Sequence, residues 1–215
     1  MLLKKLTAFC ESFSTPPAPE LLELERETHL KMLAPQMLCG HLQGQFLTML
    51  SSLMRPVAIL EIGTFTGYAS ICLAKGLPEG GILHTIEVNP ECAWLCQKYF
   101  EKAGLQEKIR LHLGDAREIV PGLAENFDLV YLDAGKNDYL FFYDLVFEKV
   151  KSGGVILADN VLWDGKVLAK SNDRDSRSME AFNRKILPFE ASFREYGLPV
   201  SIRTDNGTPF AATRG

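Results

Sequence analysis

Residues 127–133 read FDLVYLD and residues 154–160 read GVILADN, two short apolar runs that each end in polar side chains. Short apolar runs bounded by polar residues are typical of parallel strands that are buried on both faces. In an open α/β sheet, ligands gather outside the carboxyl ends of such strands. The sequence therefore predicts a functional site around Asp133, Asp159 and Asn160.

Strands and helices alternate from residue 57 onward, which favours an α/β fold with a doubly wound, mostly parallel sheet and helices on both faces. Near the end of the chain, residues 198–202 and 209–213 flank the turn sequence Asp205-Asn206-Gly207. This pattern predicts an antiparallel hairpin at the sheet edge, which makes a sheet of seven strands. The other predicted strands cover 57–62, 82–87, 108–112, 127–132 and 155–158, and the predicted helices cover 20–33, 40–54, 67–76, 90–103 and 139–150.

Length and composition predict one domain over residues 1–215, with an N-terminal helical segment (1–55) before a Rossmann-like core (56–215). The net charge is −4 and no basic block stands out, which argues against nucleic acid as a partner. No apolar stretch approaches the roughly 18 residues of a membrane span, and the first residues do not resemble a signal peptide. Five scattered cysteines without a C-x-x-C pattern indicate a reduced, cytoplasmic protein.

Asp133, Asp159 and Asn160 together offer two carboxylates and one amide oxygen. Such a set of hard oxygen ligands suits Mg²⁺ best, or Mn²⁺ or Ca²⁺, rather than zinc. About three octahedral positions remain for water or for a substrate with two adjacent oxygens. Lys136 follows Asp133 by three residues and is a candidate general base. The alternative is that Asp159 and Asn160 only cap a turn and that Asp133 only caps the next helix.

Residues 61–68, EIGTFTGY, predict a turn between a strand and a helix, whose first glycine would let the backbone approach a ligand. The spacing Gly-x-x-x-Gly differs from the Gly-x-Gly-x-x-Gly turn that binds the diphosphate of NAD or FAD. Glu61 would repel a diphosphate, but it could hold S-adenosylmethionine, which carries an ammonium, a sulfonium and no phosphate. Glu87 ends the next strand, where an acid accepts hydrogen bonds from ribose hydroxyls. Asp115 and Ala116 end the third, where an adenine edge could lie. The alternative is a tight turn beside solvated acids.

These segments together resemble the metal-dependent class I O-methyltransferases, the family of caffeoyl-CoA and catechol O-methyltransferases, and most closely its bacterial branch. The resemblance rests above all on residues 153–167, GGVILADNVLWDGKV, and extends over most of the chain. It implies a Rossmann-like methyltransferase sheet with an antiparallel hairpin at one edge, S-adenosylmethionine as methyl donor, and a homodimer. It also implies Asp133, Asp159 and Asn160 as metal ligands and Lys136 as the base. The cofactor contacts that it implies are Glu61, Gly63, Glu87, Asp115, Ala116 and Asp133.

Three departures from the family pattern concern the substrate and cofactor sides of the site. Gly135 stands where the family usually has aspartate, so one side chain near the substrate is missing. Ala69 replaces a common serine, which removes a hydroxyl from the cofactor side. Residues 198–214 do not show the usual Pro-x-x-Asp-Gly sequence. Substrate contacts from that stretch are therefore not carried over.

The sequence thus predicts transfer of a methyl group from S-adenosylmethionine to one hydroxyl of a vicinal dihydroxy aromatic molecule, with both oxygens on a divalent metal. Trp163 and Tyr139 could wall such a substrate, or belong to the core instead. One alternative is an NAD-dependent oxidoreductase on the same fold, which the glycine spacing argues against. Another is a dimeric protein that binds the cofactor without catalysis, which the complete set of candidate ligands and Lys136 argues against.

Overall fold

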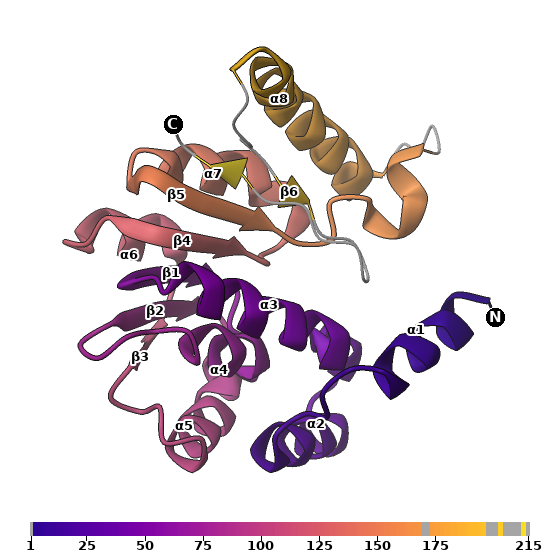
Figure 1. Ribbon diagram of the computed structural model, residues 1–215, viewed down its shortest axis with the longest axis vertical. Coiled ribbons are helices and arrows are strands. Elements are labelled where there is room, and N and C mark those ends of the chain that lie inside the picture. Colours follow the sequence, from indigo (N-terminus) through magenta and orange to yellow (C-terminus); the bar gives the residue numbers. More distant parts are fainter. Residues whose placement is uncertain (1, 169–172, 197–201, 204–211, 214–215) are drawn as a thin grey trace. The chain divides into compact units, whose positions relative to one another are not determined.

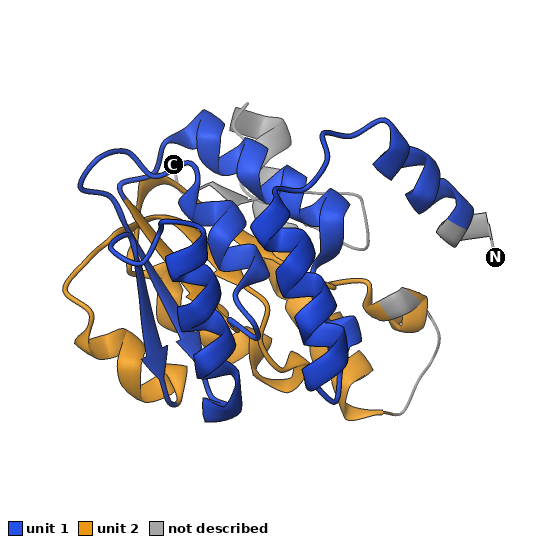
Figure 2. Ribbon diagram, turned by 90° about the horizontal axis from the view of Figure 1, so that it is seen from below, with its two compact units in different colours: residues 1–57, 64–114 blue, residues 58–63, 115–215 orange. Residues whose placement is uncertain are grey.

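The computed structural model describes residues 2–168, 173–196, 202–203 and 212–213. The chain falls into two compact units, which Figure 2 shows in blue and orange. Unit 1 comprises residues 1–57 and 64–114, and unit 2 comprises residues 58–63 and 115–215. The expectation of a single domain over residues 1–215 stays a prediction.

The described part of unit 1 contains a pair of parallel strands, β2 (Ile82–Glu87) and β3 (Ile109–Leu113). Every residue of β2 after the first is buried, as expected for a strand of a covered sheet. Helices α2 to α5 confirm, within a few residues, the helices predicted from the sequence in this unit. The helices of unit 1 are α1 (Leu2–Ser12), α2 (Pro19–Lys31), α3 (Gly40–Met54), α4 (Tyr68–Ala74) and α5 (Ala93–Lys102), with the 3-10 turns η1 (Pro35–Met37) and η2 (Pro90–Cys92).

Gly67 immediately precedes α4 and has a conformation and surroundings that require glycine. Its φ is 90°, in the left-handed region that residues with a side chain rarely adopt. A Cβ atom at this position would lie 2.6 Å from Cε1 of Phe100, on α5. All residues of α4 are buried, so this close approach lets the helix pack into the core of unit 1.

Unit 2 is built on three long parallel strands, β1 (Ala58–Ile62), β4 (Phe127–Leu132) and β5 (Val150–Ala158). β4 pairs with both of the others, and Figure 1 shows β4 and β5 running in the same direction. The register pairs the last residues of the three strands with one another, so the strands end level. The parallel strands predicted for these segments are therefore confirmed, except that β5 begins at Val150 and not at residue 155, because Val150 also pairs with Phe127 across an irregularity in the register.

The helices of unit 2 include α8, which was not among the helices predicted from the sequence. α7 confirms the helix predicted at 139–150, although it ends three residues earlier. α8 is long and mostly polar, but Met179, Phe182 and Ile186 are buried. Their spacing of three and four residues gives the helix one apolar face. The helices are α6 (Ala116–Gly122), α7 (Tyr139–Phe147) and α8 (Arg174–Tyr196), with the 3-10 turns η3 (Lys136–Asp138) and η4 (Trp163–Leu168).

The C-terminal strands pair differently from the predicted hairpin. β6 (Ile202–Arg203) pairs in parallel with β5, and β7 (Ala212–Thr213) pairs with β5 in the antiparallel sense. Among the described residues, β6 and β7 do not pair with each other. The physical reason is the length of β5, which offers separate pairs of residues to each short strand. The turn sequence that suggested the hairpin lies outside the described residues.

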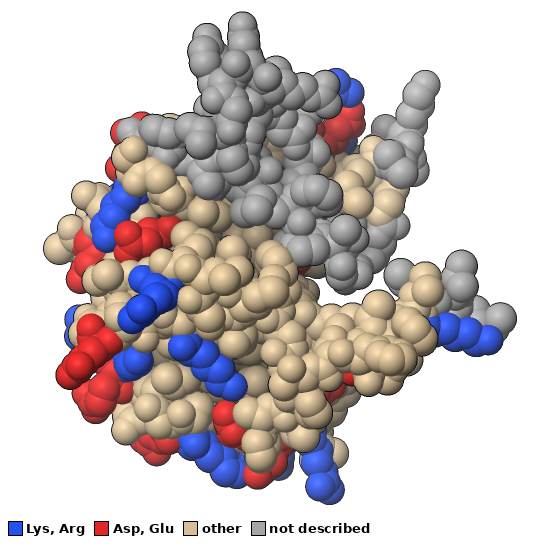
Figure 3. Space-filling model, in the orientation of Figure 1, with Lys and Arg blue, Asp and Glu red and all other residues tan. Residues whose placement is uncertain are grey.

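The surface carries charges of both signs. Figure 3 shows Lys and Arg side chains interspersed with Asp and Glu over the described residues of the visible face. Some of them form ion pairs, such as Lys98 with Glu27 and Lys151 with Asp128. Within the described part of the chain, no helix is long and apolar enough to cross a membrane.

Candidate functional site

The two predicted acids at strand ends lie next to each other in unit 2. The backbone N–H of Asp133 donates to the carbonyl of Ile62 over 2.9 Å, and that of Asp159 donates to the carbonyl of Leu132 over 2.9 Å. The parallel hydrogen-bond pattern thus continues one residue past each strand. The prediction that the carboxyl ends of β4 and β5 bring these side chains together is confirmed, whereas their chemical roles stay predictions.

Gly63 directly follows β1, just as Asp133 directly follows β4, and the last residues of these two strands are paired. Its φ is 100°, and a Cβ atom would lie 2.1 Å from the backbone oxygen of Asp133. The sequence suggested that this glycine lets the backbone approach a ligand. The structure gives another reason for glycine, because the neighbouring strand end leaves no room for a side chain.

Asp159 is fixed by two donors on its two carboxylate oxygens. Its side chain is buried, and Oδ1 accepts from the backbone N–H of Asn160 over 2.7 Å. Oδ2 accepts from the hydroxyl of Tyr131 over 3.1 Å. Asn160 itself has a φ of 54°, a left-handed conformation that asparagine tolerates better than most residues. The turn after β5 therefore holds the Asp159 carboxylate in one orientation.

Lys136 extends its side chain into the same cluster. It is only 8% exposed, and its Nζ donates to Oδ1 of Asp133 over 3.3 Å. Nζ also lies 2.7 Å from the hydroxyl oxygen of Tyr139 and 3.5 Å from the backbone oxygen of Asp159. The ring of Trp163 is 6.0 Å from the same nitrogen, within the range of a cation–π contact. The structure therefore brings Lys136 together with both acids, as the sequence predicts.

The charges in this cluster favour a divalent cation. Burial and the carboxylate of Asp159 raise the pKa of Asp133 to about 7, against the opposing effect of Lys136. Nζ of Lys136 contacts Oδ1 of Asp133 and the backbone oxygen of Asp159, so one basic group lies beside two carboxyl groups and offsets their charge only in part. Among the described residues, no three acidic, histidine or cysteine side chains lie close enough together to hold a metal ion by themselves. The set therefore relies on Asn160 for a third hard oxygen, and its chemistry fits Mg²⁺.

Tyr139 takes the core role that the sequence left open as an alternative, and its contact with Lys136 is one that sequence reasoning did not identify. Its side chain is fully buried and packs edge-on against Phe182, with ring centroids 5.4 Å apart. The hydroxyl lies 2.8 Å from the backbone oxygen of Asp159 and 3.1 Å from that of Leu132. Burial and the nearby carboxylates raise the pKa of this tyrosine well above its usual value. Tyr139 is therefore a core residue beneath the cluster, not a substrate wall. The signal that could have indicated its contact with Lys136 is the spacing of three residues between them, which places both on one side of a helical turn.

The other predicted cofactor residues of unit 2 have clear structural settings. Glu61 is fully buried on β1, and Ala116 is buried at the first position of α6. Asp115 caps that helix, because its Oδ1 accepts from the backbone N–H of Arg117 over 2.8 Å. An ion pair with the guanidinium of the same arginine adds a second contact at 3.3 Å. Asp115 is thus a helix cap, a role that the sequence had offered as the alternative for Asp133 and Asp159.

Glu87 belongs to unit 1, where both of its carboxylate oxygens are held. Oε2 accepts from the backbone N–H of Phe65 over 2.7 Å, and Oε1 accepts from the backbone N–H of Asn89 over 2.8 Å. Phe65 has a φ of 50°, so its N–H reaches the acid from a strained turn. Each oxygen keeps a lone pair for a further donor. Glu87 thus presents two fixed acceptors at the end of β2.

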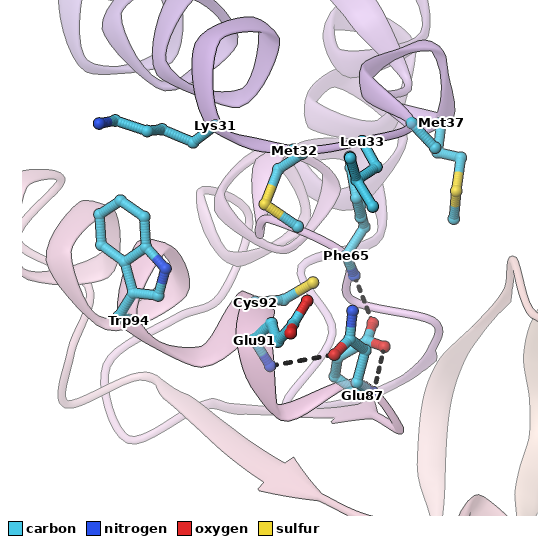
Figure 4. Close-up of a pocket in the computed structure, with 11 residues that line it drawn as sticks. Lys31, Met32, Leu33, Met37, Phe65, Glu87, Glu91, Cys92 and Trp94 are labelled. Atoms are coloured by element: carbon cyan, nitrogen blue, oxygen red, sulfur yellow. Dashed lines mark hydrogen bonds between the residues drawn. The ribbon is translucent and has the colours of Figure 1, made fainter.

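A cavity of about 370 Å³ lies beside Glu87 in unit 1. Figure 4 shows Met32 and Leu33 on one side of it and Glu87, Glu91 and Cys92 on the other. Burial, and then the charge of Glu87, raise the pKa of the Cys92 thiol to about 11, so this cysteine is no nucleophile at neutral pH. The cavity is lined by Lys31, Met32, Leu33, Ala34, Met37, Phe65, Glu87, Asn89, Glu91, Cys92 and Trp94.

Comparison with known proteins places the chain in a family. A model of the O-methyltransferase family matches residues 11–192, which is most of the chain. The chain belongs to the O-methyltransferase family. This agrees with the resemblance seen in the sequence, which rested on the strand ends that carry Asp133 and Asp159.

Two relatives show how far the similarity to other O-methyltransferases extends. A catechol O-methyltransferase from Niastella koreensis is 38% identical over 134 residues, which are 60% of this chain and 61% of that protein. Caffeoyl-CoA O-methyltransferase 2 from Petunia hybrida is 35% identical over 160 residues, 72% of this chain and 66% of that protein. The chain therefore spans slightly less than two thirds of the length of these relatives.

Solved O-methyltransferase structures confirm the fold class. The O-methyltransferase TomG from Streptomyces achromogenes, in complex with SAM, has a TM-score of 0.82 at 25% identity, and the match covers 98% of this chain and 96% of that one. An O-methyltransferase from Bacillus cereus, in complex with SAH, has a TM-score of 0.82 at 24% identity and covers 98% and 97%. The second likeness is evidence of fold alone. Both support an α/β methyltransferase fold with parallel strands.

Proposed function

We propose that this chain is an enzyme that transfers a methyl group from S-adenosylmethionine to one hydroxyl of a catechol-like aromatic molecule and requires a divalent cation. The observation that carries the proposal is the contact of the buried Lys136 side chain with Asp133, beside Asp159, at the ends of neighbouring parallel strands. Ligand sites of open α/β sheets lie at such strand ends. Relatives named catechol and caffeoyl-CoA O-methyltransferases support the substrate class.

The proposed cofactor site is supported by the preset carboxylate of Glu87. Its two oxygens each hold one backbone N–H and can each accept one further hydrogen bond, which matches the two adjacent hydroxyls of a ribose. A similar protein, TomG, was solved in complex with SAM. The proposed contacts with the cofactor are Glu61, Gly63, Glu87, Asp115, Ala116 and Asp133.

The proposed metal ligands are Asp133, Asp159 and Asn160, with Mg²⁺ as the expected ion. When bound, the ion would lower the pKa of a substrate hydroxyl and neutralise the charge that develops on its oxygen. Tyr131 and the N–H of Asn160 keep the Asp159 carboxylate oriented, and oriented ligands bind metal more tightly than free ones.

In the proposed reaction, Lys136 accepts the hydroxyl proton on Nζ. The hydroxyl oxygen then forms a bond to the methyl carbon, and the carbon–sulfur bond breaks with its electron pair retained on sulfur. The products are the methyl ether, S-adenosylhomocysteine and a proton on Lys136. Positioning and electrostatic stabilisation supply most of the rate in such a displacement. The chain's part is to hold the nitrogen of Lys136 beside the reacting oxygen.

We further propose that the two units form one Rossmann-like domain and that the protein acts in the cytoplasm as a homodimer. α1 supports the dimer, because its residues Leu6 and Phe9, with Phe13 just after its end, are exposed and apolar, and exposed apolar surface favours protein contacts. Light scattering after gel filtration tests this proposal. A monomer at micromolar concentration would exclude a stable dimer.

The direct test is to incubate the purified protein with S-adenosylmethionine and caffeic acid and to measure S-adenosylhomocysteine. We expect release with Mg²⁺ and none with EDTA. Release that is equal in both tubes would remove the metal from the proposal. If neither tube shows release, a panel of other catechols follows, and failure of the whole panel would reject the activity for this substrate class.

A further inference from the structure

Lys136 is held by a buried tyrosine three residues further along the chain. Its Nζ lies 2.7 Å from the hydroxyl oxygen of Tyr139, closer than to Oδ1 of Asp133 at 3.3 Å. We propose that Tyr139 is a positioning residue that aims the nitrogen of Lys136 at the acceptor hydroxyl. This inference rests on the function proposed above. Tyr139 is fully buried, so it acts through Lys136 and does not touch the substrate.

The direction of the hydrogen bonds follows from the atoms that surround the Tyr139 hydroxyl. The hydroxyl has one hydrogen, and the backbone oxygens of Asp159 and Leu132 lie 2.8 and 3.1 Å away. Carbonyl oxygens only accept hydrogen bonds, so the hydroxyl hydrogen points toward them. Its lone pairs are left for Lys136, which must therefore donate to Tyr139.

This direction fixes where Lys136 can accept a proton. An uncharged lysine amine has two N–H hydrogens and one lone pair. One hydrogen is directed to Tyr139 and the other to Oδ1 of Asp133 or the backbone oxygen of Asp159. The lone pair then points away from all of these acceptors. Without the tyrosine hydroxyl, the amine keeps only the two longer contacts, to Asp133 and Asp159, and its lone pair is no longer held in this direction.

Tyr139 is itself anchored to the backbone that carries the candidate metal ligands. The carbonyl of Leu132 immediately precedes Asp133, and it also accepts the N–H of Asp159 over 2.9 Å. The edge-on contact with Phe182 of α8 fixes the ring of the tyrosine. Tyr139 therefore connects Lys136 to the backbone that carries both acids. The flexible lysine side chain could not keep this position by itself.

Tyr143 offers a matched control on the same helix. It lies one turn beyond Tyr139, is also buried, and packs against the same Phe182 with ring centroids 5.9 Å apart. Its aromatic neighbour and burial thus resemble those of Tyr139, but the hydroxyl contacts of Lys136 involve Tyr139. Y143F removes the hydroxyl of a buried tyrosine on α7 without removing the proposed positioning contact.

The experiment compares wild type, Y139F and Y143F with saturating S-adenosylmethionine and Mg²⁺. We expect Y139F to lower kcat by about tenfold, the scale of one lost hydrogen bond between uncharged groups. The KM for the catechol and the Kd for S-adenosylhomocysteine should stay unchanged. Y143F should leave kcat unchanged. Equal values of kcat for Y139F and Y143F would overturn the proposal.

A double-mutant cycle separates positioning from a general structural effect. In a K136A background, Y139F should have no further effect on kcat, because the group that it positions is gone. Effects that simply add would overturn the proposal. If Y139F does not fold, F182L takes its place, since it loosens the Tyr139 ring and keeps the hydroxyl. Wild-type kcat in folded F182L would then overturn it.

A second readout does not depend on methyl transfer. Purified proteins are treated with an amine-reactive ester, and the modification of Lys136 is followed by peptide mass spectrometry. Lys136 should react faster in Y139F than in wild type or Y143F, because its nitrogen has lost its closest partner. An unchanged rate would overturn the proposal. If wild type shows no activity but Lys136 is released in Y139F, the proposed function fails while the contact is upheld.

Discussion

Tyr131 donates its hydroxyl hydrogen to Oδ2 of Asp159 over 3.1 Å, and both side chains are buried. The tyrosine lies on β4 and the acid follows β5, so this bond joins the two strands just beneath the candidate metal site. We expect Y131F to weaken Mg²⁺ binding by about tenfold, the lower end of what such orienting partners contribute. Calorimetric titration with Mg²⁺ measures this. Unchanged affinity, with Y143F as the reference, would show that the carboxylate needs no such partner.

Asp159 itself should be essential for the metal requirement. D159A removes a carboxylate that two donors hold in place, so turnover should no longer respond to Mg²⁺. D144N is the matched control, because Asp144 is an exposed acid on α7 that pairs with Lys185. A normal Mg²⁺ titration of activity in D159A would reject Asp159 as a ligand.

The raised pKa of Asp133 predicts how the stability of the metal-free protein depends on pH. A carboxyl group with a raised pKa binds its proton more tightly in the folded state. Its contribution to stability is complete below the unfolded pKa of about 3.9. It is lost as the pH rises through about 7. The melting temperature in EDTA should therefore fall over this range, and D133N should reduce the slope. The same slope in D133N would assign it to other groups.

Gly63 should tolerate no side chain. G63A combines a φ of 100° with a Cβ atom 2.1 Å from the backbone oxygen of Asp133, and we expect a loss of about 2–4 kcal/mol in unfolding free energy. Gly135 is the control, since its φ is −58° and a Cβ atom there would meet nothing within 4 Å. Urea unfolding measures both variants. A loss in G135A as large as that in G63A would contradict this account.

Glu87 should determine cofactor affinity. E87Q keeps the size of the side chain but replaces one acceptor oxygen by a donor amide, so one ribose hydroxyl loses its partner. We expect S-adenosylhomocysteine to bind about tenfold more weakly. Calorimetry of E87Q against E101Q, a change at an exposed position of α5, provides the measurement. Equal affinity of both variants for S-adenosylhomocysteine would show that Glu87 does not bind the ribose.

The strands of unit 2 and their acids were predictable because their signals are local. A run such as FDLVYLD has no polar residue on either face of the strand except Asp128, and its end is marked by Asp133. Lys136 lies within one turn of that end, so its place follows from chain connectivity. Such positions depend on residues that are near one another in the sequence.

The features that escaped prediction depend on distant parts of the chain. The hydroxyl of Tyr139 meets the carbonyl of Asp159, 20 residues away, and aromatic residues give no sign of such a contact. In the described part of α8, the buried residues Met179, Phe182 and Ile186 stand among many charged ones. The turn sequence before β7 suggested a local hairpin, whereas long-range pairing with β5 prevailed.

Most of the described non-glycine residues with a left-handed backbone conformation lie near the candidate cofactor or metal residues. Apart from Arg55, the described residues other than glycine with positive φ are Phe65, Asn160 and Trp163, beside Glu87 or the acidic cluster. Each such residue costs roughly 1 kcal/mol relative to glycine. N160G should therefore raise the melting temperature while removing the proposed third ligand. Substitutions by glycine that raise the melting temperature of this protein should therefore be found at positions where they also lower its activity.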